Sequence, residues 1–388
     1  MKLSRRELLQ AAFLAGSTLV LGDWQANPVL AKVSGGKQLG VLEFFQEGHP
    51  LMNAAQWSGL DGRLYTDLST LTDDELITAT EKFYIRTRCP DQIDLNTPWT
   101  IKINGLVENE VVVPIEAITG KCRDMGVHLM ECSGNVGFNM HFGMLSACRW
   151  SGVPVTEIID RAKVNPQATQ LLVSGFDKHS QPSVRSRAGA SWIFPLDAFG
   201  KLGAFFATEM NGTRLTNDHG FPVRMVIPGW YGCTCIKWVN EISFIDDTAP
   251  STSQMREFAS RTHQEGLPIL ARHFRPAVID RAAMAVRVEQ WLIDKQICYR
   301  VVGVIWGGEQ PTQRLAIRFV CADAPDPPYN RVDHCQEQNS ESWSLWSHMW
   351  RPQQPGVYGI QLKIEDPAVT TKRLDRGYYV RYVDIKEV

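Results

Sequence analysis

The stretch EMNGTRLTNDHGFPVRMVIPGWYGCTCIKW, residues 209–238, carries more structural information than any other part of the chain. Its short apolar runs are separated by glycine and proline, residues that end strands and form turns. The runs at 170–176 and 190–199 are also strand-like, while PVTEIIDRA at 154–162 has the apolar spacing of a helix. Residues from about 80 to 246 therefore predict a mixed α+β domain.

The bulk composition is that of an ordinary globular protein and excludes several classes of function. The chain has 388 residues, a formal net charge of −2 and a pI near 6.5. This balance gives no electrostatic reason to expect a nucleic acid or an anionic membrane as partner. The 9 cysteines form no C-x-x-C pair and no C-x-x-C-H motif. A zinc ribbon, an iron–sulfur ferredoxin and an attached c-type haem are therefore not expected.

The N-terminus, MKLSRRELLQAAFLAGSTLVLG, has the composition of an export signal. Basic residues precede an apolar stretch that is too short to span a membrane comfortably. The paired Arg5 and Arg6 resemble the twin-arginine signal, and Val29 and Ala31 favour cleavage after Ala31. A Sec signal and an uncleaved anchor are the alternatives. We predict that residues 1–31 are a signal peptide and that the protein is periplasmic; the twin-arginine route suits a chain that takes up a cofactor before export.

Further along the chain, the patterns divide the protein into two domains. A helix is expected at residues 72–83 (TDDELITATEKF), and the polar stretch after residue 246 indicates a boundary. Residues 32–246 are therefore expected to form the α+β domain, and residues 247–274 a linker. From 275 to 388, strand-like runs recur between turn residues without a helical pattern, which predicts an all-β sandwich.

Cys132, in HLMECSGNVGFNM at residues 128–140, is the main candidate for chemistry. It could be a small core residue, half of a disulfide, a nucleophile that needs a nearby base, or a thiolate ligand to a metal. Gly134 and Gly137 would let the backbone approach a bulky cofactor. A single cysteine is a sensible ligand only if an organic dithiolene supplies further sulfurs.

These motifs together resemble the sulfite oxidase family of molybdopterin-dependent oxidoreductases. E-M-N-G, D-H-G-F-P-V-R, P-G and K-W follow one another within 209–238 in the family's order, after ECSGN at 131–135. FYIRTRCPDQIDLNTPWTIKINGLV at 83–107 resembles the family's first segment, and VSGFDKHSQP at 173–182 its middle aspartate segment. The C-terminal strands resemble its immunoglobulin-like dimerisation domain. The resemblance covers most of residues 80–388.

The resemblance implies a bound molybdopterin that carries molybdenum, and it assigns individual residues to the site. These are Cys132 as the molybdenum ligand, Arg86 near the metal, Asp177 at the pterin, His219 and Arg224 at the phosphate end of the cofactor, and Cys235, Ile236 and Lys237 in a further cofactor-contacting segment. The chemistry agrees, because a phosphate favours a compact cluster of His, Arg and Lys donors. Turn glycines such as Gly220 and Gly229 can also expose backbone N–H groups toward it.

Three positions depart from the family's substrate pocket. Val136 and Gly137 stand where an arginine follows the C-x-G-N motif, and Thr208 stands where a tyrosine precedes E-M-N-G. Glu309 and Gln310 stand in place of a further sulfite-binding arginine. The pocket is therefore expected to be less cationic than in sulfite oxidases proper and to bind sulfite less well.

The function implied is periplasmic oxidation of a small sulfur-centred substrate such as sulfite. Electrons would pass to an external acceptor such as a periplasmic cytochrome, and the resemblance implies a homodimer. An alternative is the same cofactor with another substrate, through sulfoxide reduction or oxidation of a carrier-bound sulfur group. A more distant alternative is an exported, non-enzymatic β-sandwich binding protein.

Overall fold

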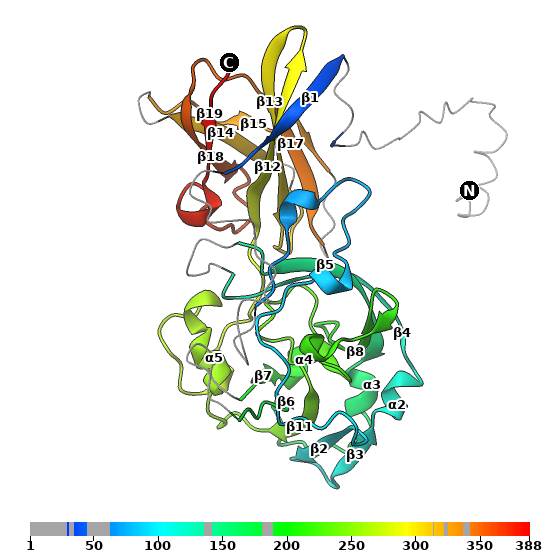
Figure 1. The fold of residues 1–388 in the computed structure, drawn as a ribbon. Coiled ribbons are helices and arrows are strands. Elements are labelled where there is room, and N and C mark those ends of the chain that lie inside the picture. The colour runs from blue at the N-terminus through cyan, green and yellow to red at the C-terminus, as the bar shows by residue number, and fades with distance from the viewer. Residues whose placement is uncertain are drawn as a thin grey trace, which may run out of the picture.

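The computed structural model describes residues 29–30, 35–44, 63–135, 142–180, 189–312, 314–321, 325–336 and 342–388. Most of the predicted signal peptide, as well as Val136 and Gly137, lies outside these residues. The chain forms two lobes, one above the other in Figure 1. The N-terminal lobe, below, is built from the middle of the chain, and the C-terminal lobe, above, from its last third together with an N-terminal strand.

Two five-stranded sheets form the N-terminal lobe. Their strands are β2 (Thr100–Gly105), β3 (Val111–Pro114), β4 (Arg123–Glu131), β5 (Leu145–Pro154), β6 (Gln170–Gly175), β7 (Ser191–Pro195), β8 (Phe205–Met210), β9 (Thr213–Arg214), β10 (Arg224–Val226) and β11 (Val239–Ile245). One sheet has the order β3-β2-β11-β6-β7, in which β2 and β11 are parallel and the other pairs antiparallel. The other has the antiparallel order β10-β8-β5-β4, and β9 pairs with β8.

Helices are short wherever the structure describes the chain. They are α2 (Glu116–Thr119), α3 (Thr156–Ile159), α4 (Leu196–Phe199) and α5 (Ser253–Glu257), with 3-10 turns η2 (Leu68–Thr70), η3 (Thr80–Lys82), η4 (Asn217–His219), η5 (Ala259–Arg261), η6 (Ala271–His273) and η7 (Gly377–Tyr379). Helix makes up 11% and strand 42% of the structure. The fold is therefore mostly β, with much less helix than the predicted α+β domain.

The helix predicted at residues 72–83 is wrong, because tertiary contacts use its backbone groups. Thr72 begins a turn by accepting a hydrogen bond from the backbone N–H of Glu75 (3.1 Å). Beyond it, the N–H of Thr78 donates to the carbonyl of Ala147 (2.7 Å), and the indole of Trp343 donates to the carbonyl of Leu76 (2.9 Å). A helix would need these same groups for its own ladder, so packing overrides the local propensity.

The C-terminal lobe consists of two antiparallel sheets that face each other. Its strands are β1 (Gly36–Leu42), β12 (Ala282–Ile293), β13 (Gln296–Trp306), β14 (Leu315–Cys321), β15 (Asn330–Arg331), β16 (His334–Cys335), β17 (Ser344–Trp350), β18 (Gly356–Ile364) and β19 (Arg381–Ile385). The sheet orders are β1-β12-β13-β17-β16 and β15-β14-β18-β19. Residues of β12 lie against β18 and β19, and Trp306 and Trp346 are fully buried.

Strand β1 belongs to the C-terminal lobe, although the sequence places it within the 32–246 domain. It pairs antiparallel with β12 from Gly36 opposite Ile293 to Leu42 opposite Val288. Its five central residues are exposed, so main-chain hydrogen bonds rather than buried side chains hold it. A strand of this kind has no apolar alternation by which the sequence could reveal its partner.

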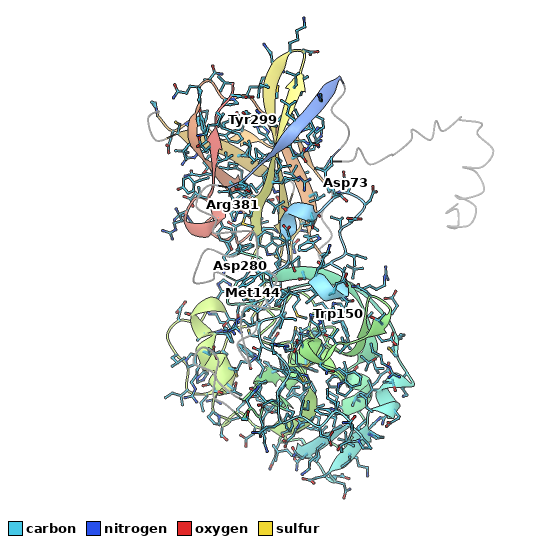
Figure 2. All side chains as sticks on the ribbon, in the orientation of Figure 1. Asp73, Met144, Trp150, Asp280, Tyr299 and Arg381 are labelled. Carbon is cyan, nitrogen blue, oxygen red and sulfur yellow. The ribbon has the colours of Figure 1, made fainter. Side chains whose placement is uncertain are left out.

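A short N-terminal segment is tied into the C-terminal lobe. Val29 is buried, and the backbone N–H groups of Val29 and Leu30 donate to the Asp73 carboxylate (3.2 and 2.7 Å). Ser347 donates to the Val29 carbonyl (2.9 Å). Figure 2 shows Asp73 beside the upper lobe. Cleavage after Ala31, as the sequence predicts, would remove these contacts. Of the helices among the described residues, none is long and apolar enough to cross a membrane.

We expect Asp73→Ala to lower the free energy of unfolding by about 1–3 kcal/mol, because partly buried donors lose a charged acceptor. Denaturant unfolding of the full chain measures the change. Asp74→Ala, at an exposed neighbour, is the control and should stay within about 0.5 kcal/mol of the unaltered protein. Equal losses in both variants would contradict the anchoring role of Asp73.

Candidate functional site

A cavity with an empty volume of about 900 Å³ lies in the N-terminal lobe. The eight residues that the resemblance assigns to the site all line it: Arg86, Cys132, Asp177, His219, Arg224, Cys235, Ile236 and Lys237. They come from five separate segments of the chain. The topology brings them together because β4, β8 and β10 belong to one sheet, and β6 and β11 to the other.

Cys132 follows the last residue of β4 and projects its thiol into the cavity. Its Sγ accepts a hydrogen bond from the N–H of Gly134 (3.3 Å). Burial raises the pKa of the Cys132 thiol, while Arg86, the Gly134 N–H and Arg63 lower it. Two cations and a backbone donor thus offset part of the effect of burial, but the pKa of the thiol stays above its ordinary value. The thiolate is the form that binds metals. Arg63 was not among the site residues predicted from the sequence.

Arg224 is a cation in the interior of the lobe. It is 4% exposed, and its guanidinium donates to the carbonyls of His219 and Cys235 (both 3.2 Å). Its Cζ lies 5.4 Å from the centre of the Trp150 ring. The buried Nε has no hydrogen-bond partner, and no carboxylate in the described parts of the chain forms an ion pair with Arg224. A buried cation with an unused donor favours an anionic ligand.

Lys237 lies beside Arg224, and a glycine makes this approach possible. The two residues face each other across an isolated antiparallel bridge. Gly220, with φ of 107°, ends η4 in the left-handed region, and a Cβ there would lie 3.1 Å from the Cβ atoms of both residues. Lys237 Nζ donates to the carbonyls of Thr87 and Asp218. Desolvation, followed by the charge of Arg224, lowers the pKa of Lys237 to about 7.

His219 forms part of the cavity wall with its ring already committed within the chain. One ring nitrogen is 2.7 Å from Thr216 Oγ1 and the other 3.1 Å from the carbonyl oxygen of Phe83. Burial lowers the pKa of His219 to about 4, so the ring is neutral near pH 7. His219 therefore shapes the site and holds its neighbours, and it adds no charge for a phosphate.

Asp177 is held by the segment that follows the gap at 181–188. Its Oδ2 accepts hydrogen bonds from the N–H groups of Gly189 (2.7 Å) and Ala190 (3.0 Å). Its Oδ1 is 2.9 Å from His179 Nε2. The carboxylate thus holds residues 189 and 190 beside its own segment as well as lining the cavity.

The donor set fits a molybdopterin that carries a metal. The buried Arg224 and the neighbouring Lys237 suit a phosphate, and Cys132 provides one thiolate elsewhere in the same cavity. Among the described residues, no group of three or more His, Cys, Asp or Glu side chains could hold a metal ion. Cys132 could therefore hold a metal here together with donors that the organic group supplies.

Several residues that line the cavity were not predicted from the sequence. Tyr84 stands two positions before Arg86 and is 7% exposed. Its hydroxyl lies against Gly232, where a Cβ would be 2.6 Å from the phenol oxygen. Burial and the nearby Cys132 raise the pKa of Tyr84, so the phenol stays protonated and can donate a hydrogen bond. No spacing in the sequence indicated this contact between residues 84 and 232.

The predicted linker at 247–274 also contributes to the cavity. Gln254 and Glu257 of α5 line it, together with Phe258. Thr252 caps α5 by accepting from the N–H of Met255 (3.2 Å), whose side chain is fully buried. The polar residues of this segment cap a helix and line the cavity, so the segment is more than a linker between the domains.

Three positions depart from the family's substrate pocket, and those that the structure describes do not line the cavity. Gly137 lies outside them. Thr208 is buried and donates to the sulfur of Cys122 (3.4 Å). The Gln310 side chain is exposed, and the backbone carbonyl of Gln310 accepts a hydrogen bond from Arg281. Neither Thr208 nor Gln310 lines the cavity.

Comparison with known families identifies the domain that contains the cavity. Residues 87–253 match the model of the oxidoreductase molybdopterin binding domain. The NADPH nitrate reductase of Beauveria bassiana is 27% identical over 197 residues, which are 46% of this chain and 21% of that protein. An NADH nitrate reductase of Nicotiana tabacum is 30% identical over 193 residues, 45% of this chain and 21% of that protein. The matched region thus spans about a fifth of these relatives.

A solved structure resembles the chain over most of its length. The sulfane dehydrogenase SoxCD from Paracoccus pantotrophus aligns with a TM-score of 0.61 and 16% identity. The alignment covers 87% of this chain and 90% of that one. At this identity the likeness shows a shared fold across both lobes.

The pKa of Lys237 predicts a pH dependence of anion binding by the cofactor-free protein. Below about pH 7 the amine is charged and attracts an anion, and above it the amine is neutral. Sulfate keeps its charge in this range, so its affinity should fall about tenfold from pH 6 to pH 8. Isothermal titration calorimetry measures the change.

Lys237→Met should bind sulfate weakly at both pH values. Lys163→Met removes an exposed lysine that does not line the cavity and should leave the pH dependence intact. A pH dependence that survives in Lys237→Met would contradict the assignment to Lys237.

Proposed function

We propose that the protein is a periplasmic molybdenum oxidoreductase that oxidises a sulfur-centred substrate such as sulfite. The proposal starts from residues 87–253, which match the oxidoreductase molybdopterin binding domain of the sulfite oxidase family. The observation that carries the proposal is the cavity that joins a cation-flanked thiol, Cys132, to a buried basic pair, Arg224 and Lys237. This arrangement has the two ends that the cofactor needs. The more distant alternative, a non-enzymatic binding protein, does not explain it.

The cofactor would be held at both ends by residues of this chain. Cys132 would ligate molybdenum, and Arg224 and Lys237 would bind the phosphate with charge-assisted hydrogen bonds. Ile236 and the Cys235 segment would form an apolar wall, and Asp177 would offer acceptors to the pterin. When bound, this group supplies oxygen-atom transfer and two-electron redox chemistry, and the protein supplies positioning and electrostatics.

The chain's own residues would select and orient an anionic substrate near Cys132. Arg86 and Arg63 both act on the Cys132 thiol through their charge, so the metal end of the cavity is cationic. A cationic pocket with buried walls attracts an oxyanion and strengthens its hydrogen bonds. Tyr84, which stays protonated, would add a neutral donor beside them.

Two replaced residues bear on the identity of the substrate. The replacements at Gly137 and Gln310 remove two cations that the resemblance associates with sulfite. They favour a second candidate with the same cofactor, sulfoxide reduction or oxidation of a carrier-bound sulfur group. Arg63 supports the first candidate, because it keeps a second cation near Cys132.

The remaining assignments are part of the same proposal. We propose that the C-terminal lobe is an immunoglobulin-like dimerisation domain, that an external carrier such as a periplasmic cytochrome accepts the electrons, and that the twin-arginine signal exports the folded protein. The likeness of both lobes to the sulfane dehydrogenase fold supports a domain of this type, and the paired Arg5 and Arg6 support the export route.

We expect the natively exported protein to contain about one molybdenum atom per chain. Cys132→Ser should lower turnover by about 100-fold or more, because the protein ligand is lost. Metal analysis and reduction of ferricyanide by sulfite measure the two quantities. Cys321→Ser, at a buried cysteine of the C-terminal lobe, is the control and should retain activity.

Two results would count against the proposal. Absence of molybdenum from the exported protein would refute an enzyme of this class. Molybdenum-replete protein that does not oxidise sulfite, but does turn over a sulfoxide, would select the second candidate.

A further inference from the structure

One tryptophan of the C-terminal lobe reaches the turn that carries Cys132. Trp306 is the last residue of β13, and its indole N–H donates to Oε2 of Glu131 (2.8 Å). Glu131 immediately precedes Cys132 and lies at the end of β4 in the other lobe. The bond therefore connects two lobes at the residue adjacent to the thiol.

The second carboxylate oxygen of Glu131 holds the far side of the same turn. Oε1 accepts a hydrogen bond from the side-chain amide of Asn135 (3.1 Å). The carbonyl of that amide accepts from the N–H groups of Gly143 (3.2 Å) and Met144 (2.8 Å). Figure 2 shows Met144 near the boundary between the lobes. Glu131 thus stands between Trp306 and Asn135 as acceptor for both.

The direction of these bonds explains the residue types. Two backbone N–H groups face the Asn135 side chain, so its oxygen must point to them and its NH₂ group must point to Glu131. The indole of Trp306 is also only a donor. Position 131 therefore needs acceptors on both sides, which a carboxylate has and an amide does not.

Backbone bonds transmit the position of Glu131 to Cys132. The N–H of Cys132 donates to the Met144 carbonyl (2.9 Å), and the N–H of Asn135 donates to the Cys132 carbonyl (2.9 Å). The carbonyl of Glu131 accepts from the N–H of Gly232 (2.7 Å). Cys132 therefore sits in a closed loop of hydrogen bonds, and Trp306 is a side chain of the other lobe that enters it.

The connection is shielded from water. Trp306 is fully buried, Asn135 is 2% exposed and Glu131 is 5% exposed. The ring of Phe142 lies 5.7 Å from that of Trp306, centre to centre, on the same side of the turn. Because water cannot readily replace the indole, loss of its N–H leaves a buried carboxylate oxygen without a partner.

We propose that Trp306 is a positioning residue for Cys132, acting through Glu131 and Asn135, and that it couples the C-terminal lobe to the metal ligand. The metal-ligand part of this inference rests on the proposed function. A displacement of the C-terminal lobe at the end of β13 would change the position of the Cys132 thiol. That lobe contributes no residue to the cavity wall described above.

The test compares two buried tryptophans whose indole N–H groups donate to different acceptors. Trp306→Phe removes the donor to Glu131 and keeps an aromatic ring. Trp343→Phe removes an equivalent N–H from a buried tryptophan of the same lobe, which donates to the Leu76 carbonyl (2.9 Å) and not to the turn. Both variants are made in the full chain, and thermal unfolding establishes that each folds.

Two readouts other than activity are needed. In cofactor-free protein, alkylation of Cys132 by iodoacetamide, followed by mass spectrometry of its peptide, should be about tenfold faster in Trp306→Phe. Trp343→Phe should change this rate by less than about twofold. In loaded protein, the electron paramagnetic resonance spectrum of the partly reduced metal should shift in Trp306→Phe and match the unaltered protein in Trp343→Phe.

Each outcome decides for or against the inference. Unchanged alkylation and spectrum in Trp306→Phe would overturn it, as would equal changes in both tryptophan variants, which would indicate general loosening. If Trp306→Phe does not fold, Glu131→Gln takes its place, because it sets a donor against a donor and should raise the alkylation rate in the same way. Absence of molybdenum from the unaltered protein would refute the proposed function alone, and the alkylation rates would still decide whether Trp306 positions the turn.

Discussion

Arg224 is buried without a carboxylate partner among the described residues, and this is the constraint on which the cavity depends. A guanidinium in the interior must be solvated by other means, and here backbone carbonyls and the face of Trp150 do part of this. Lys237 lies beside it, so two potential cations share one desolvated region. Such a site is incomplete in electrostatic terms until an anion enters, which is why its chemistry favours a phosphate-bearing cofactor.

Charge and hydrogen bonding divide the cavity into two regions with different tasks. Around Arg224 and Lys237, neutral groups such as His219 fix the geometry without adding charge. Around Cys132, burial raises the pKa of the thiol, and nearby cations offset part of that rise. The same low-dielectric surroundings thus strengthen anion binding in one region and make the thiolate dependent on its neighbours in the other.

The two lobes are connected by directional bonds as well as by apolar packing. Trp306 donates to Glu131 of the N-terminal lobe, and Arg287 of β12 and Trp343 donate to the carbonyls of Ser69, Leu71 and Leu76 in the segment that precedes that lobe. Buried hydrogen bonds of this kind fix register and orientation, because a shifted interface would leave their partners unsatisfied. The C-terminal lobe can therefore influence the site through its shape without contributing to the cavity wall.

The sequence was sufficient where several segments together resemble a known family. The resemblance of residues 83–107, 131–135, 173–182 and 209–238 to the sulfite oxidase family was enough to assign eight residues that share a cavity. The alternation of apolar and turn residues after 275 was enough to indicate strands. It was not enough at 72–83, where a helical pattern forms turns, bends and the short η3 because Ala147 and Trp343 use its polar groups.

What the sequence by itself determined is the type of domain, the cofactor and eight of the side chains that line the cavity, since the family resemblance depends on residue types in order. What only the tertiary structure decided is which partners each side chain has. Strand β1 joins β12 through backbone bonds that every residue can make, and Tyr84 fits against Gly232 because a Cβ is missing there. Trp306 meets Glu131 across 175 positions of the chain. Contacts of this kind depend on distances in space, and no periodicity along the chain encodes them.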